Sequence, residues 1–224
     1  MTGLVLHFAP QTCARVALVA LEETGAPFET RLVRFMAGDH RDPAFLARNP
    51  AGKVPLLEVD GEPLTQNGAI LPYLARRFPE ARLLPYTGDA LNDAKIQSRL
   101  AWLAADLHPL VTRIRMPHFF CDLDGAPGRV RALAMEAMAF QLADAERTLR
   151  GRPWLMGQDW SIIDAYLSWV WFRIAGAGFE VAAFPALADH HHRADARPSA
   201  QRALAIEAAA QDELERAGFS VPLS

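Results

Sequence analysis

A predicted β-hairpin that runs directly into a helix constrains the fold of this chain more than any other feature, and it lies within residues 49–74. Asp60-Gly61 is typical of a two-residue turn and would join a strand at Leu56–Val59 to a strand at Pro63–Thr65. Helical periodicity follows from about Gly68 to Phe78. This part of the chain is therefore predicted to form strand, turn, strand and helix in immediate succession.

The two ends of the hairpin are predicted to carry polar groups that could bind a ligand. Val54-Pro55 lies at a strand start, where the missing N–H of proline costs no hydrogen bond in the sheet. A cis peptide bond there would turn the chain sharply and leave the N–H and C=O of Val54 facing outward, unpaired. At the other end, Gln66-Asn67 precedes the helix, whose first N–H groups attract carboxylates. The spacing suits a short peptide that carries a carboxylate, and the alternative is an ordinary hairpin with a capped helix.

The residues before the hairpin complete an α/β pattern. Four elements are predicted there: a strand at Leu4–Phe8, a helix from about Thr12 to Thr24, a strand at Phe28–Arg34, and a short helix from Asp42-Pro43 to about Arg48. The first strand–helix–strand unit predicts parallel strands with a right-handed crossover. Its helix is apolar nearly all round, so we expect it to pack between the sheet and a second layer. The whole order is similar to the thioredoxin-like fold.

The rest of the chain is predicted to be helical. Turn-rich residues 83–90 serve as a linker between a first domain of residues 1–82 and a second domain of residues 91–224. Helical patterns without a convincing strand run over about 90–112, 128–149, 161–175, 185–194 and 198–209. The predicted architecture is therefore an α/β thioredoxin-like domain followed by an all-α helical bundle.

Composition excludes several classes of function. The 224 residues are 51% hydrophobic with a net charge of −3 and no long run of Lys or Arg, which argues against nucleic acid as a partner. The start of the chain lacks a signal-peptide pattern and no apolar stretch approaches about 18 to 20 residues, so neither export nor a membrane span is expected. The two cysteines, Cys13 and Cys121, are too few for a disulfide framework, which predicts a reducing cytoplasm. They also lack metal-ligand spacing, so no metal site is expected.

Taken together, these motifs resemble the cytosolic glutathione transferases, and most closely the cysteine-bearing bacterial types such as the beta type. The resemblance rests on Val54-Pro55, on Ser161 to Leu167, and on Pro10-Gln11-Thr12-Cys13-Ala14, which is similar to P-G-x-C-S. It covers nearly the full chain. It implies a homodimer that binds glutathione as a co-substrate and conjugates its thiolate to a small hydrophobic electrophile, as in detoxification.

The resemblance also implies which residues hold glutathione. In this family the residue before the cis-proline pairs with the cysteinyl backbone of glutathione, and a Glu/Gln-Ser pair holds the γ-glutamyl end. Val54 and Pro55 match the first motif, while Gln66 and Asn67 match the second with an amide in place of the serine. Lys53 would pair with the glycine carboxylate or remain a solvated loop cation.

Three residues are candidates for the chemistry. Cys13 stands near a predicted helix start, where N–H groups and the dipole favour the nucleophilic thiolate, unless it is a buried structural thiol. Thr12 offers a hydroxyl to a glutathione thiolate or caps the helix. His108 precedes Pro109, which would kink the helix and turn the imidazole toward a cleft. It resembles a histidine that faces the thiol site in beta-type enzymes, or it is an ordinary helical histidine.

The second domain contains residues that we interpret as structural. Ser161 and Asp164 have the spacing of a capping box, which also resembles a folding element of the family, so Asp164 is not predicted to be catalytic. The run His190-His191-His192 is a poor metal site, because consecutive helical residues face different ways. The aromatic run from Trp169 to Phe172 walls an apolar pocket for the electrophile or packs in the core.

Two alternatives to conjugation stay open. Cys13 is a possible redox nucleophile for glutathione-dependent thiol–disulfide exchange. The fold also serves as a non-catalytic binding module, and the change from serine to Asn67 would then mark a lost affinity for glutathione. Glutathione binding is expected for conjugation and for thiol–disulfide exchange, and its absence would favour the non-catalytic binding module.

Overall fold

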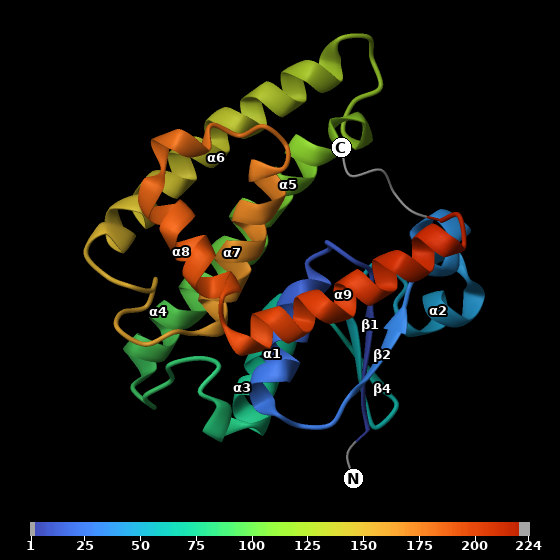
Figure 1. Cartoon of the computed structure of the whole chain (residues 1–224), viewed down its shortest axis with the longest axis horizontal. Coiled ribbons are helices and arrows are strands. Elements are labelled where there is room, and N and C mark those ends of the chain that lie inside the picture. The colour runs from blue at the N-terminus through green and yellow to red at the C-terminus, as the bar shows by residue number, and fades with distance from the viewer. Residues whose placement is uncertain (1–2, 220–224) are drawn as a thin grey trace. The chain divides into compact units, whose positions relative to one another are not determined.

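The computed structural model describes residues 3–219 (Figure 1), which form two compact units. The first unit runs to Leu83 and also includes the segment that begins at Arg197. The second unit spans Leu84–Ala196. The last helix within residues 3–219 therefore belongs to the unit that is built mostly from the beginning of the chain.

A four-stranded mixed sheet forms the centre of the first unit. The strands follow the spatial order β2 (Glu29–Leu32), β1 (Leu4–Phe8), β3 (Leu56–Val59) and β4 (Glu62–Thr65). β1 and β2 are parallel, whereas β3 is antiparallel to β1 and to β4. Val59 pairs with Glu62, so Asp60-Gly61 forms the predicted two-residue turn, with φ angles of 52° and 89°. The thioredoxin-like arrangement predicted for this region is confirmed.

Helices surround this sheet in the first unit. They are α1 (Ala14–Thr24), α2 (Pro43–Arg48), α3 (Asn67–Arg77) and α9 (Pro198–Arg216), with 3-10 turns at Phe35–Ala37, Asp39–Arg41 and Pro79–Ala81. Asp42 caps α2, because its carboxylate accepts a hydrogen bond from the N–H of Ala44 at 2.8 Å. α1 ends at Thr24, and Gly25 is its C-cap, with a φ of 65° in the left-handed conformation that glycine adopts readily.

α1 is the central helix of the first unit, and it packs against β1, α3 and α9. The side chains of Leu18 and Leu21 are fully buried, and each contributes about 1.5–3 kcal/mol of hydrophobic stabilisation. The predicted position between the sheet and a second layer is confirmed. Figure 1 shows α9 running beside α1, so the second layer comes from the far end of the chain.

The second unit is helical, as predicted. Its helices are α4 (Ala90–Ala101), α5 (His108–Arg115), α6 (Ala126–Arg150), α7 (Ile162–Ala175) and α8 (Pro185–Asp195), with a π-helical segment at Trp102–Leu107 and 3-10 turns at Pro117–Phe119 and Val181–Ala183. Across residues 3–219, no helix combines the length and the apolar character that crossing a bilayer requires.

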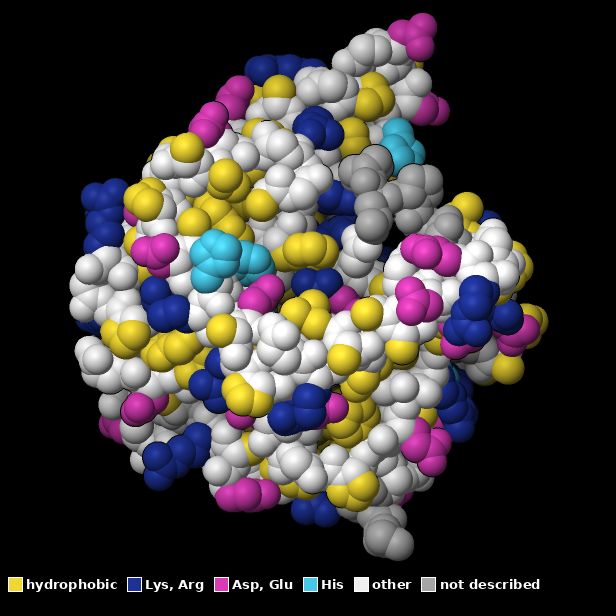
Figure 2. Space-filling model, in the orientation of Figure 1, with side chains coloured by type: hydrophobic (Ala, Val, Ile, Leu, Met, Phe, Trp, Pro, Cys, Tyr) yellow, Lys and Arg dark blue, Asp and Glu magenta, His cyan; other side chains and the backbone are white. Residues whose placement is uncertain are grey.

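On the face in Figure 2, cationic and anionic side chains are interspersed, in keeping with the small net charge.

The π-helical segment lies directly before Pro109. A proline inside a helix has no N–H to bond the carbonyl four residues earlier, here that of Ala105, and its ring collides with that carbonyl. A local π-helix widens the turn and relieves the collision. The distortion expected at Pro109 is therefore present, as a widened turn between α4 and α5.

A buried polar cluster lies on the sheet of the first unit. His7 Nε2 of β1 is 2.6 Å from Glu58 Oε1 of β3, and Arg48 Nε lies 3.0 Å from the same oxygen. Burial lowers the pKa of His7 below its ordinary value of 6.5, and the hydrogen bond that His7 makes to Glu58 offsets only part of this effect. Folding therefore disfavours the protonated form of His7.

We expect the free energy of unfolding to fall as the pH drops below about 6.5, where the unfolded chain binds a proton at His7 before the folded chain does. The loss should continue until His7 of the folded chain is protonated as well. Urea unfolding at several pH values measures it. His7→Gln keeps a donor for Glu58 but cannot titrate, so its stability should decline less steeply. If the free energy of unfolding fell equally steeply with pH in the wild type and in His7→Gln, His7 would not be the source of the pH dependence.

Candidate functional site

The loop before β3 carries the predicted peptide clamp. The bond between Val54 and Pro55 is cis, as predicted, and both residues are buried. The side chain of Asn49 donates a hydrogen bond to the carbonyl of Lys53 at 2.6 Å and holds the loop, while the Lys53 side chain is exposed. Within residues 3–219, the N–H of Val54 donates no hydrogen bond.

One expectation about this clamp was wrong. The carbonyl of Val54 is not unpaired, because the thiol of Cys13 approaches it with Sγ at 3.7 Å from the oxygen. A thiol is a weak hydrogen-bond donor. The contact therefore brings the predicted nucleophile to the predicted clamp through an interaction that a stronger donor is able to replace.

Cys13 also contacts the start of α3. The side-chain amide of Asn67 donates a hydrogen bond to the carbonyl of Cys13 at 2.8 Å, across 54 positions of sequence. Cys13 is half-buried and is the N-cap residue of α1. The structure thus brings three predicted site residues together. The sulfur of Cys13 contacts the carbonyl of Val54, and the carbonyl of Cys13 accepts a hydrogen bond from Asn67.

Thr12 has a structural role in the same turn. Its hydroxyl donates to the carbonyl of Ala9 at 2.7 Å and accepts from the N–H of Ala14 at 3.3 Å. α1 begins at Ala14 rather than near Thr12, because the residues before it form this tighter turn. The hydroxyl hydrogen of Thr12 is therefore already directed to a backbone carbonyl.

Gln66 and Asn67 differ in their exposure. Gln66 is exposed and has a φ of 71°, which is uncommon outside glycine and clusters at functional sites. Asn67 is only 4% exposed, and its amide nitrogen faces Cys13 rather than solvent. The first N–H groups of α3, at Asn67 and Gly68, have no acceptor within the helix because of their position. Of the two side chains, that of Gln66 is therefore the one that is exposed to solvent beside the start of α3.

His108 lies in the second unit, at the start of α5 and directly after the π-helical segment. Its Nδ1 is 2.9 Å from the hydroxyl of Tyr166, and its ring packs edge-on to Trp169 with centroids 4.7 Å apart. Both partners belong to α7 and are buried. The aromatic run of α7 thus packs in the core at Trp169 and Trp171, and it orients the His108 ring.

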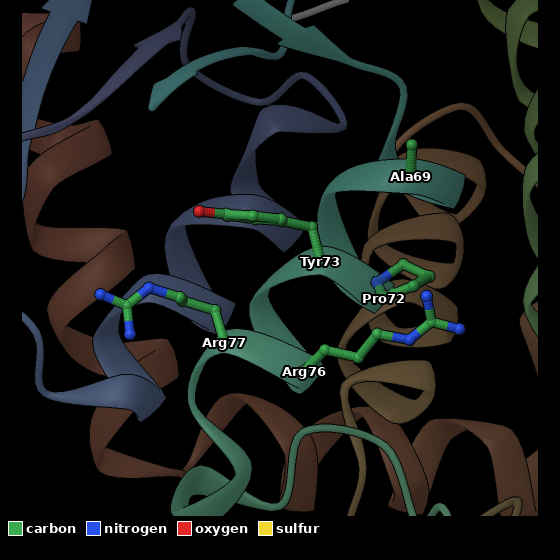
Figure 3. A pocket seen from close by; sticks show the side chains of 5 residues that line it. All are labelled: Ala69, Pro72, Tyr73, Arg76 and Arg77. Atoms are coloured by element: carbon green, nitrogen blue, oxygen red, sulfur yellow. The ribbon is translucent and has the colours of Figure 1, made fainter. Parts of the chain in front are cut away.

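A shallow pocket of about 490 Å³ lies on α3, the helix that follows Gln66 (Figure 3). Tyr73 and Arg77 extend to one side of the helix and Pro72 and Arg76 to the other. The residues that line the pocket are Ala69, Pro72, Tyr73, Arg76 and Arg77. None of them is among the predicted site residues, so this pocket is distinct from the Cys13 turn.

Two charged residues beside the Cys13 turn were not predicted from the sequence, and they are Arg15 of α1 and Glu207 of α9. Each is less than a tenth exposed. Glu207 Oε2 accepts hydrogen bonds from Arg15 Nε at 2.9 Å and from its Nη2 at 2.6 Å, while Oε1 accepts from the N–H of Gln11 at 3.1 Å. The sequence does indicate that Glu207 is buried, because it interrupts a stripe of small and apolar residues with helical spacing. A buried carboxylate needs a partner, so an interaction of Glu207 could have been predicted. The stripe consists of Ala200, Ala203, Ala210 and Leu214.

Comparisons with known proteins agree with this architecture. Residues 1–76 match the family model "Glutathione S-transferase, N-terminal domain". The chain is 34% identical over 203 residues to glutathione S-transferase GST-4.5 of Xanthomonas campestris pv. campestris, covering 90% of this chain and 98% of that protein. Two solved structures cover 91% of this chain and 98% of their own. They are a sphingomonad glutathione S-transferase complexed with glutathione (33% identity, TM-score 0.79) and the bacterial beta class enzyme of Sphingomonas chungbukensis (32% identity, TM-score 0.80).

Proposed function

Because this chain belongs to the glutathione S-transferase family, we propose that it binds glutathione in its first unit and conjugates the glutathione sulfur to a small hydrophobic electrophile. The observation that carries this proposal is the convergence of Val54, Cys13 and the start of α3. A peptide clamp, a thiol and a helix start then lie at one place in the first unit. These groups suit a short thiol peptide with a carboxylate.

In this proposal Val54 binds the cysteinyl residue of glutathione through its N–H and C=O. An amide N–H is a stronger donor than a thiol, so glutathione would displace Cys13 Sγ from the carbonyl of Val54. Gln66 and the first N–H groups of α3 hold the γ-glutamyl end. Lys53, which is exposed beside the clamp, pairs with the glycine carboxylate in the same proposal.

The reaction then needs a thiolate and a held electrophile. The glutathione thiolate attacks an electrophilic carbon, the new C–S bond forms, and the leaving group departs with its electron pair. The enzyme accelerates this step by holding the two reactants together and by placing fixed dipoles near the sulfur. We assign the contact with the sulfur to Cys13, with Thr12 and His108 as further candidates for assisting it. A homodimer and a cytoplasmic location are part of the same proposal.

A second function is favoured by the position of the Cys13 thiol at the clamp, 3.7 Å from the carbonyl oxygen of Val54. The Cys13 thiolate would attack the glutathione sulfur of a mixed disulfide and release the other thiol. A second glutathione would then attack the resulting Cys13–glutathione disulfide, which frees Cys13 and yields glutathione disulfide. Both functions use the same glutathione site.

Gln66→Ala is expected to weaken glutathione binding at least about tenfold, which is about 1.4 kcal/mol. The reason is that the exposed Gln66 side chain is the polar group beside the start of α3. Calorimetric titration of reduced glutathione measures the change. Gln66→Glu matches the other residue that the family uses here, so its affinity should stay within about threefold of the wild type. Unchanged binding in Gln66→Ala would remove Gln66 from the site, and absent binding in the wild type would refute both functions.

A further inference from the structure

The turn that carries Cys13 contains a backbone conformation that needs support. Gln11 has a φ of 63°, in the left-handed region that residues other than glycine rarely adopt. Such a conformation persists only when its surroundings hold it. Because Gln11 lies two residues before Cys13, its conformation sets the direction in which the chain enters the N-cap of α1.

Glu207 supplies this support from the other end of the chain. Its two carboxylate oxygens have separate partners, since Oε2 accepts from the guanidinium of Arg15 and Oε1 accepts from the N–H of Gln11. The Arg15 pair neutralises the buried carboxylate and orients it. The second oxygen is then held at 3.1 Å from the N–H of Gln11, the residue with the left-handed conformation.

α9 is also anchored along α1 by contacts away from this turn. Arg197 Nη2 donates to Glu23 Oε1 at 2.8 Å, and the side chain of Ser199 donates to the same oxygen at 2.5 Å. Arg202 Nη2 donates to the carbonyl of Glu22 at 3.0 Å. These contacts fix α9 at the C-terminal end of α1, so Glu207 is delivered to the other end on a rigid helix.

We propose that Glu207 is a positioning residue for the active-site turn, which holds Gln11 in its left-handed conformation and thereby directs Cys13 toward the carbonyl of Val54. The proposal deepens the proposed function, because it assigns a residue of α9 to the geometry of the same site. Arg15 is the counter-ion that allows the carboxylate to be buried. Loss of the ion pair alone and loss of the Gln11 contact should therefore have different consequences.

A pair of double variants separates the two roles. Arg15→Met with Glu207→Gln removes both charges and keeps an amide oxygen for the Gln11 N–H. Arg15→Met with Glu207→Met removes the charges and the acceptor but keeps a side chain of similar length. Neither variant has an unpaired buried charge, so the comparison isolates the hydrogen bond to Gln11. Arg202→Gln is the matched control, since it changes a contact between α9 and α1 that does not involve the turn.

Two readouts decide the outcome in folded protein. The first is the rate constant for alkylation of Cys13 by iodoacetamide, with mass spectrometry separating Cys13 from Cys121. The second is the pair of kcat and KM values for glutathione with a dinitrophenyl halide. The variant with Glu207→Gln and the Arg202→Gln control should stay within about twofold of the wild type. The variant with Glu207→Met should lose about tenfold in alkylation rate and in kcat with little change in KM.

Equal alkylation rates and equal kcat values in the two double variants would overturn the proposal. If the wild type bound and conjugated nothing, the proposed function would fail, while the alkylation rates would still decide whether Glu207 positions Cys13. If the variant with Glu207→Met does not fold, Glu207→Asp with Arg15 retained replaces it. That change shortens the reach to Gln11 but keeps the charge, and the same loss of alkylation rate is expected.

Discussion

Asp164→Ala is expected to lower the free energy of unfolding by about 3–5 kcal/mol. The carboxylate of Asp164 has no exposed surface, and it accepts hydrogen bonds from the backbone N–H groups of Leu155 at 2.8 Å and Ser161 at 2.9 Å. Its Oδ1 is also 2.9 Å from Nε2 of His190, which is fully buried. Removing the carboxylate leaves several buried donors without an acceptor, and each costs free energy. The midpoint of urea unfolding measures the loss.

Asp144→Ala provides the matched control for that measurement. Asp144 is an aspartate of the same unit, but its side chain is 57% exposed and pairs with Arg147 on the helix surface. Its removal should cost no more than about 1 kcal/mol. If Asp164→Ala proved as mild as Asp144→Ala, the capping box would not be the structural element that we describe. The predicted structural role of Asp164 agrees with the capping box found at the start of α7.

Cys13→Ala is expected to reduce glutathione-dependent disulfide exchange by at least about 1000-fold. Exchange requires a protein sulfur that attacks and later leaves, and alanine offers none. Binding of glutathione should survive, because Val54 contributes backbone groups and Gln66 lies at the start of α3. Reduction of a mixed disulfide of glutathione and a small thiol measures the exchange, and calorimetry measures the binding.

Cys121→Ala is the control, since Cys121 is the other partly exposed thiol and belongs to the second unit. It should leave exchange unchanged. If Cys13→Ala retained full exchange activity, the redox function would be excluded. If it lost conjugation to the same degree, Cys13 would be required for the transferase reaction as well. Measuring both disulfide exchange and conjugation in Cys13→Ala therefore distinguishes the two functions.

Features with a local cause were predictable from the sequence. The hairpin at Asp60-Gly61, the cis bond before Pro55 and the capping box at Ser161 each depend on residues within a few positions of one another. The distortion before Pro109 was predictable for the same reason, although its form as a π-helix was not. Several helical arrangements relieve the same collision, and the packing of neighbouring side chains selects among them.

Features that depend on distant partners were not predictable in this way. The amide of Asn67 was expected to face a ligand, but it bonds the carbonyl of Cys13, because the sheet brings the start of α3 to the turn. The pair of Arg15 and Glu207 spans 192 positions of sequence. A single sequence shows that both residues interrupt apolar faces, but it does not show that they meet. Their pairing follows from the return of α9 to the first unit.

That return has a consequence for exchanging parts between members of the family. A hybrid enzyme that took residues 3–83 from one relative and the remainder from another would place a foreign α9 against α1. The carboxylate opposite Arg15 would then come from the wrong parent, and residues in one contact network are not independent. The exchangeable module is therefore discontinuous, and a working hybrid should carry the segment from Arg197 onward together with the first 83 residues.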